Sequence, residues 1–128
     1  MNAGKTFYGK HYSMSKLAKY LISDLQGDSS KPSTKFFRSS GAYGYILWLT
    51  VVDNFYSEKN MTVDELVSKL EKYASRRTIL DFINKGVDAK FLEKKFFLND
   101  KRKILINPTD ITIKEYRNWS EHFTKSIT

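Results

Sequence analysis

The sequence predicts a mainly α-helical domain with one small β-hairpin, an α+β fold formed by a single domain over residues 1–128. Apolar residues recur at helical spacing in several segments, and this spacing changes to alternation between residues 91 and 98. Capping residues stand before two short helical segments in the second half of the chain. The length suits one domain, and a content of 41% hydrophobic residues suits a folded core. We therefore expect one globular unit.

The chain is basic, with 22 lysines and arginines against 14 acidic residues and a formal net charge of +8. A positive surface attracts nucleic acids, acidic proteins and anionic membranes alike, so charge alone predicts a polyanionic partner. The lack of cysteine excludes disulfides and thiolate metal sites. The first thirty residues show no secretion signal, and the most apolar stretch, residues 45–52, is too short to span a membrane. We expect a cytoplasmic protein.

The first half of the chain predicts two helices separated by a loop. The first helix is expected to be capped by Ser13 and to carry one apolar stripe, formed by Met14, Leu17, Ala18, Leu21, Ile22 and Leu25. Residues 27–34 are rich in Gly, Ser and Pro, which predicts the loop. Between residues 41 and 55 apolar side chains cover most of the circumference, as in a central helix packed on several sides. A buried strand is the alternative, and the length of the segment favours the helix.

Residues 62–88 predict a helix-turn-helix pair. Thr62 followed by Glu65 has the form of a capping box, and the helix after it carries an apolar stripe of Val63, Leu66, Val67 and Leu70. Ser75 can cap the next helix, which turns Ile79, Phe82 and Ile83 inward. Gly86 is expected to mark the end of this helix or a bend near it.

Residues 91–107 predict a β-hairpin, and a last helix follows. Residues 91–98 alternate in polarity, residues 104–106 form a second strand-like run, and Asn99 with Asp100 supplies turn chemistry between them. The tip, residues 99–103, is charged. Thr112 and Glu115 have the spacing of a second capping box before a helix that bears Tyr116, Trp119 and Phe123.

The expected order, helix, helix, short turn, helix, hairpin, helix, is that of a winged helix-turn-helix with flanking terminal helices. In a helix-turn-helix the second helix of the pair enters the DNA major groove, and its amino-terminal residues contact base edges. The residues predicted to bind DNA from this helix are Ser75, Arg76, Arg77, Thr78, Asp81, Asn84 and Lys85.

The side chains of this helix suit different parts of a duplex. Either arginine can contact guanine through two hydrogen bonds, Asn84 suits adenine, and Lys85 suits a phosphate. Arg77 is the favoured base reader because it shares a helical face with Asp81 and Asn84. The alternative is that these residues are only the solvated side of a helix.

Positive charge is concentrated between residues 76 and 103, where nine basic residues face four acidic ones. DNA favours such clusters because each neutralised phosphate releases condensed counterions. From the hairpin, the predicted DNA-binding residues are Lys95, Asp100, Lys101, Arg102 and Lys103. Lysines that protect an edge strand from aggregation are the alternative, and they account less well for the three basic residues at the tip.

Residues 61–109 resemble the winged helix-turn-helix of the MarR family of transcriptional regulators. The opening of the recognition helix is matched by Ser75, Arg76, Arg77, Thr78 and Ile79, and the wing signature Asp-x-Arg by Asp100, Lys101 and Arg102. The entry to the pair (residues 61–66), the lead into the wing (residues 91–94) and residues 106–109 also match. The resemblance implies that Arg102 reaches the minor groove, that Asp100 helps to hold it, and that terminal helices form a homodimer.

The predicted dimer interface consists of Leu17 and Leu21 in the first helix and Tyr116, Trp119 and Phe123 in the last. Two copies would place two recognition helices on a palindromic site. The alternative is that these apolar stripes complete the core of one chain.

Signals for an enzyme are weak. His11 and His122 are the only histidines, and neither has acidic or cysteine neighbours at metal-ligand spacing, so no catalytic residue, metal or cofactor is predicted. The predicted function is sequence-specific binding of double-stranded DNA by a transcriptional regulator, with repression favoured by the resemblance alone. The alternative is a winged-helix protein-interaction or architectural module that reads no sequence, and a small nucleic-acid-processing enzyme ranks third. The sequence identifies no small-molecule effector.

Overall fold

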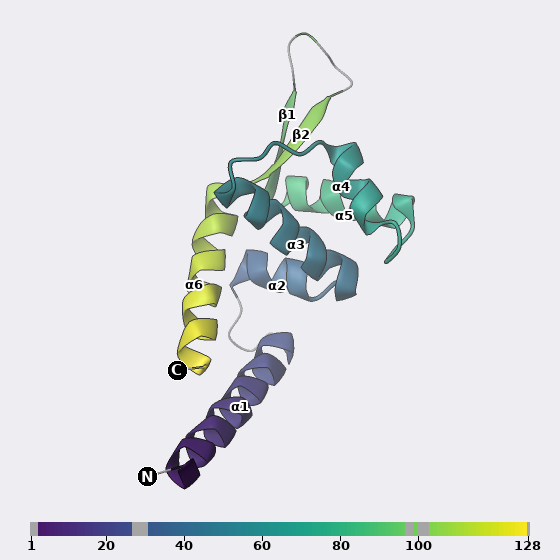
Figure 1. Ribbon diagram of the computed structural model, residues 1–128. Coiled ribbons are helices and arrows are strands. Elements are labelled where there is room, and N and C mark those ends of the chain that lie inside the picture. Colours follow the sequence, from purple (N-terminus) through teal and green to yellow (C-terminus); the bar gives the residue numbers. More distant parts are fainter. Residues whose placement is uncertain (1–2, 27–30, 97–98, 100–102, 128) are drawn as a thin grey trace.

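The computed structural model describes residues 3–26, 31–96, 99 and 103–127. The chain folds into helices packed around a central core, with one β-hairpin (Figure 1). The elements in chain order are α1 (Ala3–Gln26), α2 (Pro32–Arg38), α3 (Gly41–Tyr56), α4 (Val63–Leu70), α5 (Arg76–Asp88), β1 (Leu92–Phe96), β2 (Ile104–Pro108) and α6 (Asp110–Ser126). The predicted mainly α fold with one antiparallel hairpin is confirmed. Within the described residues, no helix is both long and apolar enough to cross a membrane.

The core is built around α3, which lies between α6 on one side and the α4–α5 pair on the other (Figure 1). Its Leu47 and Trp48 are fully buried, and Val51 is nearly so. The residue pattern that favoured a helix over a strand for this segment is therefore confirmed, because side chains on several faces of α3 contact other elements. The inward stripes of α4 and α5 complete the same cluster, with Leu66, Val67, Leu70, Ile79 and Ile83 all at 0% exposure.

The two predicted caps of the helix pair are present. The Thr62 hydroxyl oxygen accepts a hydrogen bond from the backbone N–H of Glu65 at 3.1 Å, and the Ser75 oxygen accepts one from the N–H of Thr78 at 3.1 Å. In the first cap, Glu65 accepts from the Thr62 hydroxyl instead of reaching the Thr62 backbone N–H. Each cap satisfies a backbone donor that has no partner inside its helix.

The end of α5 differs from the expectation for Gly86. The helix continues to Asp88, and Lys90 closes it in a left-handed conformation with φ of 65°. The N–H of Phe91 donates to the carbonyl of Gly86 at 2.8 Å, and that of Lys90 donates to Val87 at 3.0 Å, the pairing of a Schellman motif. Gly86 is needed for another reason: a Cβ at this position would lie 2.8 Å from Leu92 Cδ1.

In the first half of the chain, one helix start was predicted wrongly and one short helix was not predicted. The first helix begins at Ala3, so Ser13 lies inside α1 and is not its cap; no proline precedes Met14, and an established helix extends easily through such residues. Residues 32–34, which were predicted as part of a loop, belong instead to the unpredicted helix α2, which begins at Pro32. Proline is well suited to a first helical position, where its missing N–H and fixed φ cost nothing.

The predicted capping box before the last helix is also wrong. The helix starts at Asp110 with Thr109 as its N-cap, so Thr112 and Glu115 lie within α6 and are buried. The Thr112 hydroxyl donates to the carbonyl of Phe91 at 2.7 Å. Glu115 Oε1 accepts from the backbone N–H of Ser33 at 2.9 Å and from its hydroxyl at 2.7 Å. The two side chains therefore connect α6 to the start of the hairpin and to α2.

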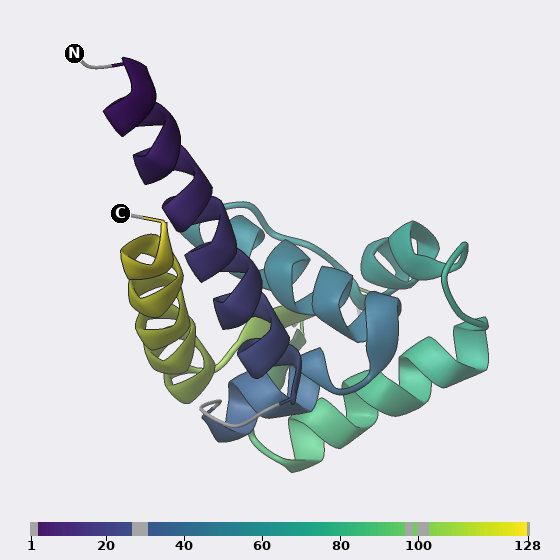
Figure 2. The ribbon, with the colours of Figure 1, turned by 90° about the horizontal axis from the view of Figure 1, so that it is seen from below.

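The amino-terminal helix runs beside α6 and projects away from the rest of the chain (Figure 2). Tyr20 donates a hydrogen bond to the carbonyl of Trp119 at 3.2 Å. Asp24 forms an ion pair with Arg38 of α2, and both side chains are more than nine-tenths buried. The Arg38 guanidinium also lies over the Tyr45 ring, 4.2 Å from its centroid. These contacts hold the second half of α1 to the body.

Candidate nucleic-acid interface

One side of α5 is exposed along its whole length, next to the hairpin. Its inward side chains, Ile79, Phe82 and Ile83, are buried in the core. The opposite side presents residues that sequence analysis selected: Arg77, Thr78, Asp81, Asn84 and Lys85. Because residues 77, 81 and 84 are four and three positions apart on one helix, they form a single exposed stripe.

The two neighbouring arginines at the start of α5 have different surroundings. Arg76 is half exposed and pairs with Asp64 of α4 at 2.9 Å and with Glu71 at 3.4 Å. Its guanidinium is thus directed back toward the first helix of the pair, and it connects the turn to both helices. Arg77 is exposed, and no hydrogen bond or ion pair with another described residue engages it. Arg77 is the arginine that is available to a ligand.

Ser75 and Thr78 serve the start of α5. Besides accepting the capping bond, the Ser75 hydroxyl donates to the Thr78 hydroxyl oxygen at 2.9 Å. Both residues are exposed, yet this hydrogen bond and the capping bond already use much of their capacity. Their local role is to hold the amino-terminal turn of α5.

A contact that sequence analysis missed joins α5 to the hairpin. Lys94 of β1 donates from Nζ to Asn84 Oδ1 at 2.9 Å. The alternation of Leu92, Lys94 and Phe96 could have indicated it, because that pattern places Lys94 on the strand face that meets α5. A contact with adenine through two hydrogen bonds needs the same Oδ1 as an acceptor, so Asn84 must share this oxygen or release Lys94 to make it.

The hairpin adds positive charge beside this stripe. Its strands pair in register from Leu92 with Pro108 to Phe96 with Ile104. Lys95 and Lys103 are exposed, as the prediction requires of DNA-binding residues. Asp100, Lys101 and Arg102 lie outside the described residues, so the wing contacts expected of them remain predictions. Figure 1 shows the hairpin projecting from the body beyond the level of α5.

The residues predicted for a dimer interface divide into two groups. In α6 the ring centroids of Tyr116 and Trp119 lie 5.5 and 5.0 Å from that of Trp48, and Phe123 stacks on Trp119 at 5.4 Å. These side chains pack within one chain. In α1, Leu17 and Leu21 are half buried, while Met14, Ile22 and Leu25 are 54%, 57% and 67% exposed. An apolar surface therefore remains on α1, and its use in a dimer stays a prediction.

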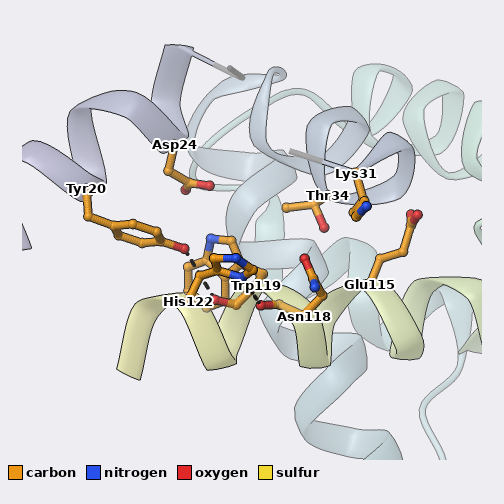
Figure 3. Close-up of a pocket in the computed structure, with 8 residues that line it drawn as sticks. All are labelled: Tyr20, Asp24, Lys31, Thr34, Glu115, Asn118, Trp119 and His122. Carbon is orange, nitrogen blue, oxygen red and sulfur yellow. Dashed lines mark hydrogen bonds between the residues drawn. The ribbon is translucent and has the colours of Figure 1, made fainter. Parts of the chain in front are cut away.

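A small polar pocket lies where α1, α2 and α6 meet (Figure 3). It is lined by Tyr20, Asp24, Lys31, Thr34, Glu115, Asn118, Trp119 and His122. Its volume of about 20 Å³ has room for about one water molecule. Burial, followed by the nearby Asp24 charge, raises the pKa of Tyr20 to about 12, so this hydroxyl stays protonated at neutral pH. The pocket is too small for an organic ligand in this arrangement.

The part of the chain that the structure describes offers no cluster of His, Asp or Glu that could hold a metal ion. His122, one of the two histidines, hydrogen-bonds through Nδ1 to the carbonyl of Asn118 on its own helix at 2.7 Å.

No protein-family model and no curated protein sequence matches the chain. Solved structures do resemble it. The heme sensor protein PefR from Streptococcus agalactiae, solved with heme, matches with a TM-score of 0.54 at 14% identity, over 86% of this chain and 72% of PefR. A double mutant of ZitR from Lactococcus lactis matches with a TM-score of 0.49 at 18% identity, over 70% of this chain and 60% of ZitR.

BpsR from Bordetella bronchiseptica, whose DNA binding is regulated by 6-hydroxynicotinic acid, matches with a TM-score of 0.48 at 15% identity, over 89% of this chain and 75% of BpsR. This chain spans 60% of the length of ZitR, which is less than two thirds. The match to PefR confirms the predicted winged-helix fold.

Proposed function

We propose that this protein binds double-stranded DNA sequence-specifically and acts as a transcriptional regulator. The observation that carries the proposal is the exposed stripe of α5. Arg77 stands without a partner among the described residues at its capped amino-terminal end, and a lysine-bearing hairpin lies alongside. The fold shared with PefR supports the proposal, because it is the arrangement in which such a helix enters a major groove.

Each part of the surface has a distinct role in this mechanism. The stripe of α5 lies in the major groove, where Arg77 donates two hydrogen bonds to the O6 and N7 acceptors of guanine. Lys85 and Lys95 neutralise phosphates and release counterions. Lys94 fixes the position of β1 on α5 through Asn84. Arg102 is proposed to enter the adjacent minor groove with Asp100 beside it.

We further propose that the active form is a homodimer on a palindromic site. The exposed side chains Met14, Ile22 and Leu25 of α1 supply an apolar surface that a second copy can cover. Two recognition helices then read half-sites separated by about 34 to 36 Å, one turn of the duplex.

Repression is the favoured direction of regulation, on the resemblance to the MarR family alone. PefR is a heme sensor, and DNA binding by BpsR is regulated by 6-hydroxynicotinic acid. A reporter gene behind the selected site should be transcribed less in cells that express the protein.

Selection of binding sites from a random duplex pool tests the proposal. The wild-type chain should recover a short inverted repeat with half-sites about one helical turn apart. Its affinity for that repeat should exceed its affinity for random duplex by about a thousandfold or more at physiological salt. If no duplex binds at low salt, the proposed function is wrong.

The second candidate is a docking or architectural role without sequence reading, and one observation favours it. Asp81 and Asp88 are exposed on the outer side of α5, where they oppose Arg77 and Lys85 in charge. A surface of mixed charge suits an acidic and basic protein partner as well as DNA. Tight low-salt binding with no enriched sequence in the selection would favour this candidate.

A further inference from the structure

Phe96 is an exposed large apolar residue on the hairpin. Its side chain is 63% exposed, although it stands on the strand face that carries buried Leu92. Its cross-strand partner, Ile104, is partly buried against the core. The chain therefore presents an aromatic ring at a position where neither folding nor solubility calls for one.

The course of β1 across α5 explains where this ring lies. Alternate side chains share a strand face, so Leu92, Lys94 and Phe96 point the same way. Leu92 packs against Gly86 of α5, and Lys94 reaches Asn84, which stands on the exposed stripe. Two residues of strand advance about 6.6 Å, so the next side chain on this face, Phe96, extends beyond the exposed surface of α5.

The surroundings of Phe96 combine apolar and positive groups. The ring lines a surface groove together with the apolar Val87 and Leu92, the polar Thr109, the basic Lys90 and Lys94 and the acidic Glu93. Lys95, which directly precedes Phe96, is exposed on the opposite face of the strand. The sugar–phosphate edge of a duplex has the complementary chemistry, because apolar deoxyribose carbons alternate with anionic phosphates. With two lysines against one glutamate in the groove, charge complementarity favours DNA as the occupant over an apolar protein surface.

We infer that Phe96 is a DNA-contacting residue that inserts its ring at the minor-groove edge next to the major groove occupied by α5, and that it bends the duplex there. Apolar wedges of this kind separate neighbouring base steps and kink DNA toward the major groove. The inference rests on the proposed function. It adds an apolar contact from Phe96 and a bend in the duplex, neither of which follows from DNA contacts by arginine and lysine alone.

Measurement of affinity and bending in parallel tests this inference, with the full chain and a short duplex carrying the selected site and a fluorophore at each end. Phe96→Ala should lower the affinity about tenfold, because it leaves one aromatic side chain less to bury. It should leave the slope of log affinity against log salt unchanged, since no charge is removed. Energy transfer between the two ends should rise on binding of the wild type and rise clearly less with Phe96→Ala.

Three matched variants sharpen the result. Phe96→Leu should retain most of the affinity and bending, because a leucine can still act as a wedge. Lys95→Ala should reduce the salt slope by about one, in contrast to Phe96→Ala. Phe55→Ala removes a comparably exposed phenylalanine from α3, 45% exposed, and should change neither readout.

The outcomes separate the two proposals. If the wild type binds the duplex and Phe96→Ala matches it in affinity and energy transfer, the role of Phe96 is wrong and the proposed function stands. If Phe96→Ala and Phe55→Ala lose affinity equally, the effect is not local and the role of Phe96 is again rejected. If the wild type binds no duplex, the proposed function and this inference fail together.

Discussion

At the scale of single residues, Arg76 and Arg77 show how neighbours of the same type acquire different tasks. Arg76 pairs with the Asp64 and Glu71 carboxylates, while Arg77 lies on the exposed stripe of α5. A guanidinium that is already paired must give up those contacts before it can bind a base. Arg77 needs no such exchange, so base reading is expected from Arg77 and a general electrostatic contribution from Arg76.

Replacement of each arginine separately tests this difference. Arg77→Ala should cost about 1 to 3 kcal/mol of binding free energy at the selected site and relax the preference at one symmetric base pair. Arg76→Ala should weaken binding to all sequences alike, because it leaves the Asp64 and Glu71 charges uncompensated close to the phosphates. Binding titrations on the selected site and on its single-base variants measure both effects. A relaxed preference for Arg76→Ala instead would reverse the assignment.

At the scale of elements, local interactions define both ends of α5. Ser75 caps its start, and Lys90 in a left-handed conformation closes its end. Lys90 occupies the left-handed position, where glycine would be less strained. The same lysine stands on the rim of the groove beside the hairpin. Glycine at position 90 would therefore favour stability, whereas lysine favours DNA binding.

The variant Lys90→Gly separates these two effects. It should raise the free energy of unfolding by about 0.5 to 1 kcal/mol, because glycine adopts positive φ without steric strain. It should also lower DNA affinity and reduce the salt slope by about one, if Lys90 neutralises a phosphate. Glu58→Gly is the matched control, since Glu58 has φ of 55° and lies outside the proposed DNA surface. Urea unfolding and DNA titration together decide, and an unchanged salt slope would remove Lys90 from the interface.

The attachment of α1 depends on the buried pair of Asp24 and Arg38. Asp24→Ala should lower the free energy of unfolding by about 3 to 5 kcal/mol, because it leaves a buried guanidinium without its counter-charge. Asp64→Ala breaks an ion pair whose side chains are 52% and 75% exposed, and it should cost no more than about 1 kcal/mol. Urea denaturation of both variants makes the comparison. Equal losses would show that Asp24 has no special part in holding α1.

At the scale of the whole molecule, the terminal helices have unequal roles. The aromatic residues of α6 pack against Trp48 and belong to the core of one chain. The amino-terminal helix projects from the body (Figure 2). Its large apolar side chains Met14, Ile22 and Leu25 are exposed, and the proposed dimer depends on this surface. A dimer built on α1 would thus leave the core of each chain complete.

The variant Ile22→Glu tests this dimer without disturbing the core, because Ile22 is 57% exposed. The wild type should be a dimer in light scattering, and Ile22→Glu should be a folded monomer, since a bare carboxylate is costly to bury in an apolar interface. Lys69→Glu makes a larger change of charge on the exposed side of α4, away from α1, and should leave the dimer intact. A monomeric wild type at high concentration would contradict the prediction.

The sequence by itself determined the features whose causes are local. The caps at Thr62 and Ser75, the circumference of α3 and the alternation of β1 are set by residues a few positions apart, and all of them are present in the structure. Only the tertiary structure decided the rest. Arg76 meets Asp64 across twelve residues, and Glu115 of α6 meets Ser33 of α2 across 82. Gly86 is required by the approach of Leu92, not by a helix end. Such pairings form only when the elements pack against one another. A local pattern such as Thr-x-x-Glu therefore does not predict which distant residue its side chains will contact.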